Sequence, residues 1–140
     1  MPHEKKQWFF IFALVLSALA WLTACGQEKK LSGTDQDAVL AFSEAAIDNL
    51  FASLTANDYA AFSRDSDKYM RAAIPAINFA AWKQDLDNKI GNYLSRKVDQ
   101  VTQTDEFYVV VYQAKFEQEE LVIVTVAFHV AEPHSISFLA

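Results

Sequence analysis

Two consecutive apolar segments near the C-terminal end of the chain constrain its fold more than any other feature. Residues 107–116 (FYVVVYQAKF) and 121–130 (LVIVTVAFHV) are rich in β-branched and aromatic residues, which suit extended strands. The link between them, residues 117–120 (EQEE), is short and charged. Two such segments with so short a connection predict an antiparallel β-hairpin.

Side chains alternate between the two faces of a strand, and here both faces are apolar. One face of the second segment carries only apolar residues: Val122, Val124, Val126, Phe128 and Val130. The other face carries Leu121, Ile123, Thr125, Ala127 and His129. A sheet that is apolar on both sides needs cover on both sides. Helices can supply one cover, so we expect the second face to contact a partner subunit or to line a ligand cavity.

Helical periodicity precedes the strands. Residues 35–55 predict a long helix, because apolar residues recur there at steps of three and four: Val39, Phe42, Ala46, Ile47, Leu50 and Leu54. Asp58 is expected to cap a short second helix, and residues 69–74 suggest a further helical turn. Pro75 and Gly91 fit the start and the end of a third main helix.

Two weaker strands complete the pattern, at about residues 94–103 and 135–139. Helices followed by a run of strands indicate an α+β fold rather than an α/β fold. We therefore expect helices packed on a curved antiparallel sheet of about four strands, in a single domain that spans residues 37–140.

The N-terminal end has the composition of a targeting segment. A short basic start with Lys5 and Lys6 precedes an uncharged apolar run of 17 residues, from Trp8 to Ala24. A basic head, an apolar middle and small residues at the exit are typical of a secretory signal. By length alone the run also lies at the short limit for a membrane-spanning helix.

The end of this run, Leu22-Thr23-Ala24-Cys25-Gly26, resembles the lipobox of bacterial lipoprotein precursors. The resemblance implies lipid transfer to the Cys25 sulfur, removal of residues 1–24, and acylation of the new amino group by a fatty acid such as palmitate. Two or more acyl chains anchor a protein stably in a membrane. The alternative is an uncleaved signal anchor in which Cys25 is incidental.

The lipobox resemblance also implies a place in the cell. The protein would be lipid-anchored in the cell envelope, and Gly26 is compatible with an outer membrane facing the periplasm. Residues 25–36 would then be the lipidated cysteine and a flexible tether, since this stretch is polar and has no apolar periodicity. Cys25 is the single cysteine, so the domain contains no internal disulfide.

Net charge limits the partners. Removal of residues 1–24 takes away Glu4, Lys5 and Lys6, which leaves 10 basic against 17 acidic side chains and a net charge of −7. An acidic domain without a basic stripe is not expected to bind nucleic acid, nor to hold anionic lipid through a polybasic patch. The membrane contact would be made by the lipid alone.

The helical part resembles a known superfamily. The sequence LFASL at 50–54, followed by Asn57-Asp58-Tyr59 and Phe62, is similar to the opening of nuclear transport factor two-like (cystatin-like) domains, and the helix with Trp82 and Gly91 fits their next part. The resemblance implies a curved sheet wrapped around helices, a cone whose open end holds an apolar ligand, and frequent homodimers formed through the outer sheet face. Enzymes of this superfamily place Asp, His or Tyr inside the cone, but no such catalytic set can be transferred to this sequence.

Five residues are candidates for the wall of such a cavity: Tyr69, Trp82, Tyr93, Tyr112 and His129. The aromatic residues offer an apolar body with a polar tip. Ordinary core packing is the competing interpretation for all four. His129 can titrate near neutral pH, and it is either hydrogen-bonded at the rim of the sheet or paired with a carboxylate inside the cavity.

Metal and cofactor chemistry are not expected. His129 and His134 would need a carboxylate such as Glu132 to hold a metal, and Asp65-Ser66-Asp67 lacks the spacing of a calcium loop. There is no glycine-rich phosphate cradle. The sequence therefore predicts a membrane-tethered, non-enzymatic binding or interaction domain.

Two other functions remain open. One is a small isomerase- or hydrolase-like enzyme that uses His129 with a carboxylate in a cavity for a small apolar ligand. The other is a structural envelope component, recognised by a partner protein through the sheet face that carries Val109 and Val111.

Overall fold

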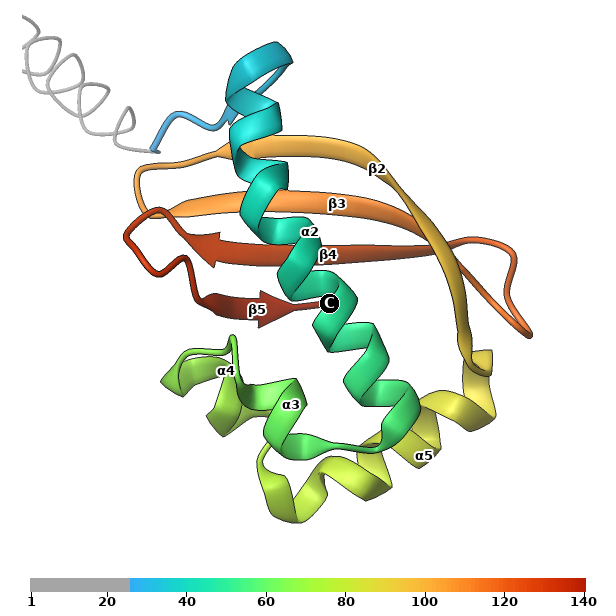
Figure 1. Ribbon diagram of the computed structural model, residues 1–140. Coiled ribbons are helices and arrows are strands. Elements are labelled where there is room, and N and C mark those ends of the chain that lie inside the picture. Colours follow the sequence, from blue (N-terminus) through green and yellow to red (C-terminus); the bar gives the residue numbers. More distant parts are fainter. Residues whose placement is uncertain (1–25) are drawn as a thin grey trace, which may run out of the picture.

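The computed structural model describes residues 26–140, so the signal segment and Cys25 lie outside the described residues. Helices precede a mainly antiparallel sheet, which confirms the predicted α+β class (Figure 1). The elements are β1 (Lys29–Lys30), α2 (Gly33–Ala56), α3 (Tyr59–Ser63), α4 (Lys68–Ala73), α5 (Ala76–Ile90), β2 (Tyr93–Gln103), β3 (Phe107–Phe116), β4 (Val122–His129) and β5 (Ile136–Leu139).

The helix ends follow local chemistry. The Asp58 side chain accepts a hydrogen bond from the Ala61 N–H at 3.1 Å, as expected of a cap for α3. Helix α5 lies between Pro75 and Gly91, as predicted. Gly91 has a positive φ of 77°, and a Cβ atom there would lie 2.8 Å from the Cβ of Glu117. Only glycine fits this turn without displacing the loop after β3.

The sheet is ordered β1-β2-β3-β4-β5, with every neighbouring pair antiparallel. The central hairpin is confirmed: β3 and β4 pair continuously from Phe107 opposite His129 to Ala114 opposite Val122. Next to the outer edge of β5, residues 65–67 pair with Ile136 through two backbone hydrogen bonds, Ile136 N–H to Asp65 O and Asp67 N–H to Ile136 O.

The predicted flexible tether is wrong for residues 29–36. Lys29 and Lys30 pair with Gln103 and Thr102 as the edge strand β1, and Leu31 is only 2% exposed. Helix α2 then begins at Gly33. A two-residue strand of lysines shows no apolar pattern, because backbone hydrogen bonds hold it. The domain therefore begins before residue 37, the boundary that periodicity indicated.

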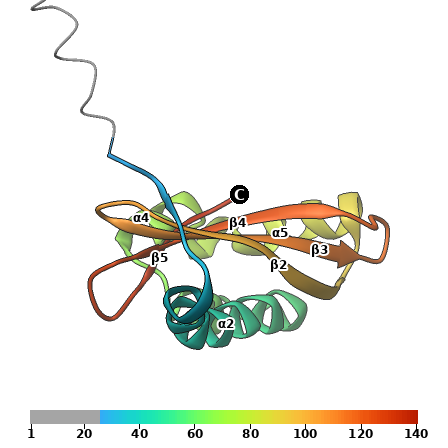
Figure 2. The same cartoon turned by 90° about the horizontal axis from the view of Figure 1, so that it is seen from above.

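All the helices contribute to one core on one face of the sheet. Figure 2 shows α2 along one side of the sheet, and Figure 1 shows α3, α4 and α5 beyond the β5 edge. By length and composition alone α2 could cross a membrane, but its apolar stripe belongs to this core. The core contains Val39, Ile47, Leu50, Phe62 and Phe79 from helices, and the even-numbered residues Val110, Tyr112, Ala114, Phe116, Val124, Val126 and Phe128 from β3 and β4.

Candidate functional site

The face of the sheet that points away from α2 is exposed in part: Thr102 and Ala127 are buried, Val109 and Val111 are half-buried, and its edges are open to solvent. Its odd-numbered residues on β3 and β4 do not belong to the core cluster. We call this surface the open face, and it consists of Phe107, Val109, Val111, Ile123, Thr125, Ala127 and Phe138 with Gln100 and Thr102. Ile123 and Phe138 are each 52% exposed. Exposed apolar side chains at both ends of a half-buried apolar surface favour an interaction surface.

The register arranges the open face in rows. Thr102, Val109, Ala127 and Phe138 lie side by side across four strands. Gln100, Val111 and Thr125 form the next row. Beyond them polar side chains surround Ile123, which lies opposite Gln113: Gln113 donates to Asp99 at 2.7 Å, and Lys115 pairs with Glu120 at 2.8 Å. An apolar centre with a polar rim matches the anatomy of protein interfaces.

On the inner face, a polar network fills the space between α2 and the sheet. The Tyr112 hydroxyl donates to Glu44 Oε1 at 2.8 Å, and Arg96 reaches Glu44 Oε2 at 2.9 Å and Asp48 Oδ1 at 2.8 Å. The Arg96 side chain is 8% exposed and donates also to the Tyr93 hydroxyl. These contacts join α2 to β2 and β3.

Burial shapes the protonation of this network. Burial, followed by the hydrogen bond to Glu44, raises the pKa of Tyr112. For Arg96, burial alone would lower the pKa, but Asp48, Tyr93 and Glu44 outweigh it and raise the pKa. At neutral pH the interior therefore holds a neutral phenol and a charged guanidinium between carboxylates. Sequence reasoning missed Glu44 and Arg96, because each is one charged residue in an ordinary amphipathic pattern.

The five predicted cavity residues do not share one cavity. The prediction is wrong for Tyr69, which is 63% exposed because α4 turns Met70, and not Tyr69, towards the core. Tyr112 is fully buried, and Tyr93 stacks on Phe51 with ring centroids 4.0 Å apart. Trp82 lines an apolar groove of about 240 Å³ that also includes Leu86, Ile90, Val122 and Leu139, between α2, α5 and the ends of β4 and β5.

His129 lies at the end of β4 and is paired with a carboxylate. Its Nε2 atom lies 2.8 Å from Asp67 Oδ2. Asp67 also caps α4, since its Oδ1 accepts from the N–H groups of Tyr69 and Met70 at 2.8 Å each. The imidazole is 34% exposed, and His129 lines neither the apolar groove nor the cleft described next.

The Asp67 carboxylate is held ionised. Burial by itself would raise the pKa of Asp67, but hydrogen bonds from the Met70 N–H, His129, Ser137 and the Tyr69 N–H outweigh it and lower the pKa to about 2. The pair therefore favours a charged carboxylate that orients the imidazole. This arrangement ties β4 to α4.

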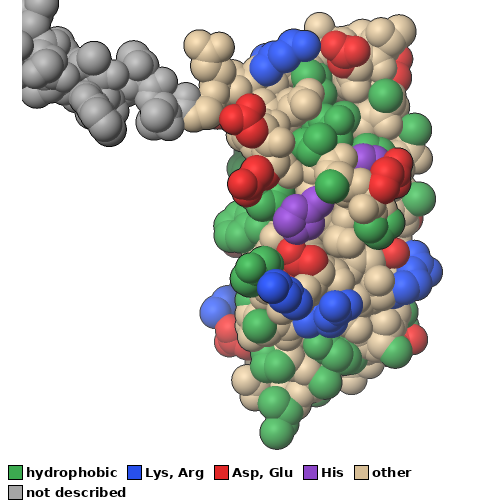
Figure 3. All heavy atoms as spheres, turned by 90° about the vertical axis from the view of Figure 1, so that its left-hand side faces the viewer, with side chains coloured by type: hydrophobic (Ala, Val, Ile, Leu, Met, Phe, Trp, Pro, Cys, Tyr) green, Lys and Arg blue, Asp and Glu red, His purple; other side chains and the backbone are tan. Residues whose placement is uncertain are grey.

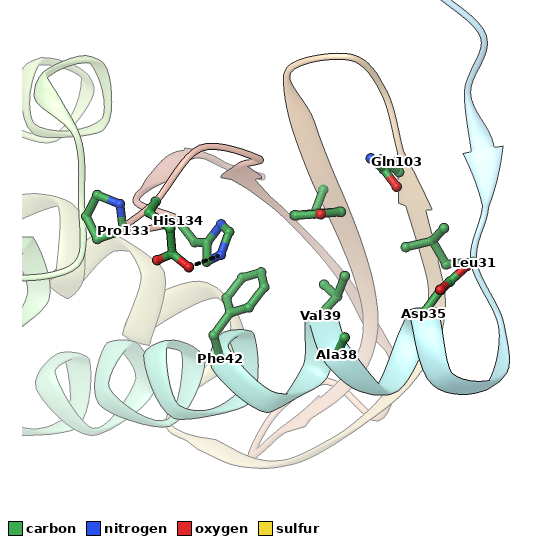
Figure 4. Close-up of a pocket in the computed structure, with 10 residues that line it drawn as sticks. Leu31, Asp35, Ala38, Val39, Phe42, Gln103, Pro133 and His134 are labelled. Atoms are coloured by element: carbon green, nitrogen blue, oxygen red, sulfur yellow. Dashed lines mark ion pairs between the residues drawn. The ribbon is translucent and has the colours of Figure 1, made fainter.

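A cleft of about 520 Å³ lies beside the N-terminal half of α2. It runs from Leu31 and Asp35 at one end to Pro133 and His134 at the other, with Phe42 on its floor (Figure 4). His134 stacks on Phe42 with ring centroids 4.1 Å apart. Sequence reasoning missed the cleft, since its residues come from three distant parts of the chain.

The surroundings of the cleft are acidic. On the side of the molecule that Figure 3 shows, acidic side chains lie around the histidines, and basic side chains lie below them and at the top of the view. No group of three or more His, Cys, Asp or Glu side chains in residues 26–140 is arranged to hold a metal ion. No family model, curated protein or solved structure matches the chain.

Proposed function

We propose that this protein is a lipid-anchored protein of the bacterial cell envelope, and that its domain is a non-enzymatic interaction module that binds through the open face. The single observation that carries this proposal is the partly exposed apolar surface that extends from Ile123 past Val111 and Val109 to Phe138. Exposing Ile123 and Phe138 to water is unfavourable. Burial of these two side chains under a partner would therefore contribute favourable free energy to binding.

A second copy of the chain is the partner that this face fits best. The rim carries both signs, with Lys97 and Lys115 near Asp99 and Glu120. A two-fold axis through the apolar centre brings the same patch onto itself, so a face with both charges can be complementary to its own copy. Homodimers also tolerate an apolar centre better than transient complexes do.

The N-terminal course of the described chain supports close anchoring. Gly26 lies beside the turn between β2 and β3, where an added Cβ would be 3.6 Å from Asp105 Oδ2. From Lys29 onward the chain is paired with β2. A lipid on Cys25 would therefore hold the domain close to the membrane, with little free tether.

The interface is tested by the oligomeric state of the detergent-solubilised full chain. Val111→Asp places a charge in the centre of the open face, and we expect the wild type to be dimeric and the variant monomeric in analytical ultracentrifugation. Ile77→Asp is the matched control, because Ile77 is 90% exposed on α5, away from the open face. A wild-type monomer at all concentrations would disprove the homodimer.

The anchor is tested by metabolic labelling with radioactive palmitate in a bacterial host. We expect label on the wild type and none on Cys25→Ser, with the variant lost from the membrane fraction. Incorporation of equal label by both proteins would contradict lipidation at Cys25. The interface experiment is independent of this result, so the two parts of the proposal can fail separately.

One observation favours the alternative of a small hydrolase- or isomerase-like enzyme, namely the 2.8 Å contact between His129 and Asp67. A carboxylate that orients an imidazole is a common arrangement of a general base. The test compares wild type and His129→Gln on activated esters and on ketosteroid-type isomerisation substrates. Turnover by the wild type that the variant loses would support the enzyme.

A further inference from the structure

The cleft beside α2 combines aromatic walls with carboxylates, and no Lys or Arg side chain is among the residues that line it. Its lining is Leu31, Asp35, Ala38, Val39, Phe42, Gln103, Tyr108, Glu132, Pro133 and His134. The volume of about 520 Å³ falls within the range of small-molecule sites. Leu31, Val39 and the aromatic rings form the apolar part, so the cleft can take a ligand with an apolar body.

The aromatic wall is held in place by packing. Phe42 lies 5.9 Å from Tyr108 and 4.1 Å from His134, ring centroid to ring centroid. His134 Nδ1 lies 2.9 Å from the carbonyl oxygen of His129, which fixes the ring over Phe42. The backbone of His134 has a φ of 59°, a region that residues with a Cβ rarely adopt. The loop between β4 and β5 is thus pinned to α2 as a wall of the cleft.

The charged groups of the cleft are negative and largely free to meet a ligand. Glu132 is 85% exposed and contacts His134 Nε2 at 3.2 Å. Asp35 pairs with Lys29 at 3.6 Å, but both side chains are about two-thirds exposed, and such a pair is weak. The partial positive charge at the start of α2 offsets part of the negative charge of Asp35, so the net charge at this end of the cleft stays negative. An anionic ligand is therefore disfavoured, and a cation would compete with Lys29.

From this combination we propose that the cleft binds an ammonium group carried on a small apolar body. The ring of Tyr108, whose centroid lies 6.0 Å from that of His134, offers a face to a poorly hydrated cation, and Glu132, which contacts His134, supplies the counter-charge at the same end of the cleft. The ligand can be a free amine or the ammonium headgroup of a lipid. The lipid headgroup as ligand rests on the proposed lipid anchor at Cys25. The next residue, Gly26, lies beside this end of the domain, so the anchor would bring the membrane near it.

The test is a calorimetric titration of the full chain in a maltoside detergent, which carries no ammonium group. Choline is the probe, and 3,3-dimethylbutan-1-ol is its uncharged counterpart of the same shape. We expect choline to bind and the alcohol to bind at least roughly tenfold more weakly. Because the measurement is made in detergent, it does not depend on the anchor or on the open face.

Three variants localise the site. Tyr108→Leu removes a ring face, Glu132→Gln removes a charge at constant shape, and each is expected to weaken choline binding roughly tenfold. Glu119→Gln is the matched control, because Glu119 is an exposed carboxylate in the loop between β3 and β4. Near-ultraviolet circular dichroism verifies that each variant is folded.

Two results would overturn the proposal: no binding at millimolar choline, or equal binding of choline and the alcohol. Equal affinity of all three variants for choline would show that choline does not bind in this cleft. A second titration, in phosphatidylcholine and in phosphatidylglycerol nanodiscs, distinguishes a free amine from a lipid headgroup as the ligand. In high salt, which screens the attraction of choline to the anionic lipid, weaker binding of choline in phosphatidylcholine shows that the lipid headgroup enters the cleft, and equal binding shows that the cleft takes a free amine but not the headgroup.

Discussion

At the scale of single residues, side chains that are unremarkable in the sequence hold the structure together. Asp67 lies in a polar loop, yet it caps α4 and pairs with His129 at 2.8 Å. Tyr112 is a strand aromatic whose hydroxyl donates to a carboxylate on α2. In both cases the local sequence pattern predicted only the helix or strand in which the residue lies. The contact that the side chain makes is with a residue more than 60 positions away.

The low pKa of Asp67 predicts how its contribution depends on pH. The pKa is about 2 in the folded protein, below the roughly 3.9 of an unfolded chain. A depressed pKa stabilises the fold above the unfolded value, and this stability is lost as the pH falls from about 4 towards 2. Asp67→Asn keeps a capping oxygen but loses the charge, so it should cost about 2 kcal/mol at pH 7, and the difference from wild type should shrink below pH 4.

Urea unfolding of both proteins at a series of pH values measures this difference. Asp58→Asn is the control, because Asp58 caps α3 without a histidine partner. A stability difference for Asp67→Asn that stays constant down to pH 2 would show that the charge of Asp67 is not involved.

At the scale of elements, the position of α2 on the sheet depends on one buried cation. Arg96 on β2 contacts Glu44 and Asp48 on α2, and it lies over the ring of Tyr112 at 5.4 Å. The contacts cross from helix to sheet between residues about 50 positions apart. Local propensity places α2 and β2 separately, and this network fixes how they meet.

Removing the Arg96 guanidinium should therefore lower the stability of the folded protein. Arg96→Met leaves Glu44 with only the Tyr112 hydroxyl as partner, and since Glu44 and Asp48 are 40% and 72% exposed we expect a loss of about 1 to 2 kcal/mol in the free energy of unfolding. Lys89→Met removes an exposed cation on α5, whose pair with Asp85 is about two-thirds exposed, and should have little effect. Chemical denaturation of the two variants gives the comparison, and equal stabilities would show that the network is not a major support.

At the scale of the whole molecule, one sheet separates two different surfaces. The inner face packs on α2 and on residues of α3, α4 and α5, and the open face contributes none of its β3 and β4 residues to that core cluster. The proposed homodimer would cover that face and leave the cleft at the far end of α2 accessible. The protein would then hold two sites with separate roles, an apolar one for a partner and an acidic, aromatic one for a cation.

Dimer formation couples the stability of the protein to its concentration. If folding and association are linked, raising the concentration tenfold should raise the Tm of the wild type by roughly 3 °C. The Tm of Val111→Asp should stay constant. Differential scanning calorimetry at several concentrations makes the measurement, and a wild-type Tm that does not depend on concentration would argue against a coupled dimer.

The sequence by itself determined the helices α2 and α5, the cap of α3, the β3–β4 hairpin and the apolar character of both its faces. These features depend on residues close together in the chain, through periodicity, capping and turn chemistry. It also supplied the prediction for Cys25, which lies outside the described residues.

Only the tertiary structure decided that β1 replaces most of the tether, that Tyr69 lies outside the core, and that a polar network occupies the interior where a cavity was expected. It alone brought Asp35, Tyr108 and Glu132 to one cleft. The physical reason is that such contacts depend on how finished elements dock. The packing of helices and strands against one another depends on side chains far apart in the sequence, and such contacts produce no local sequence pattern.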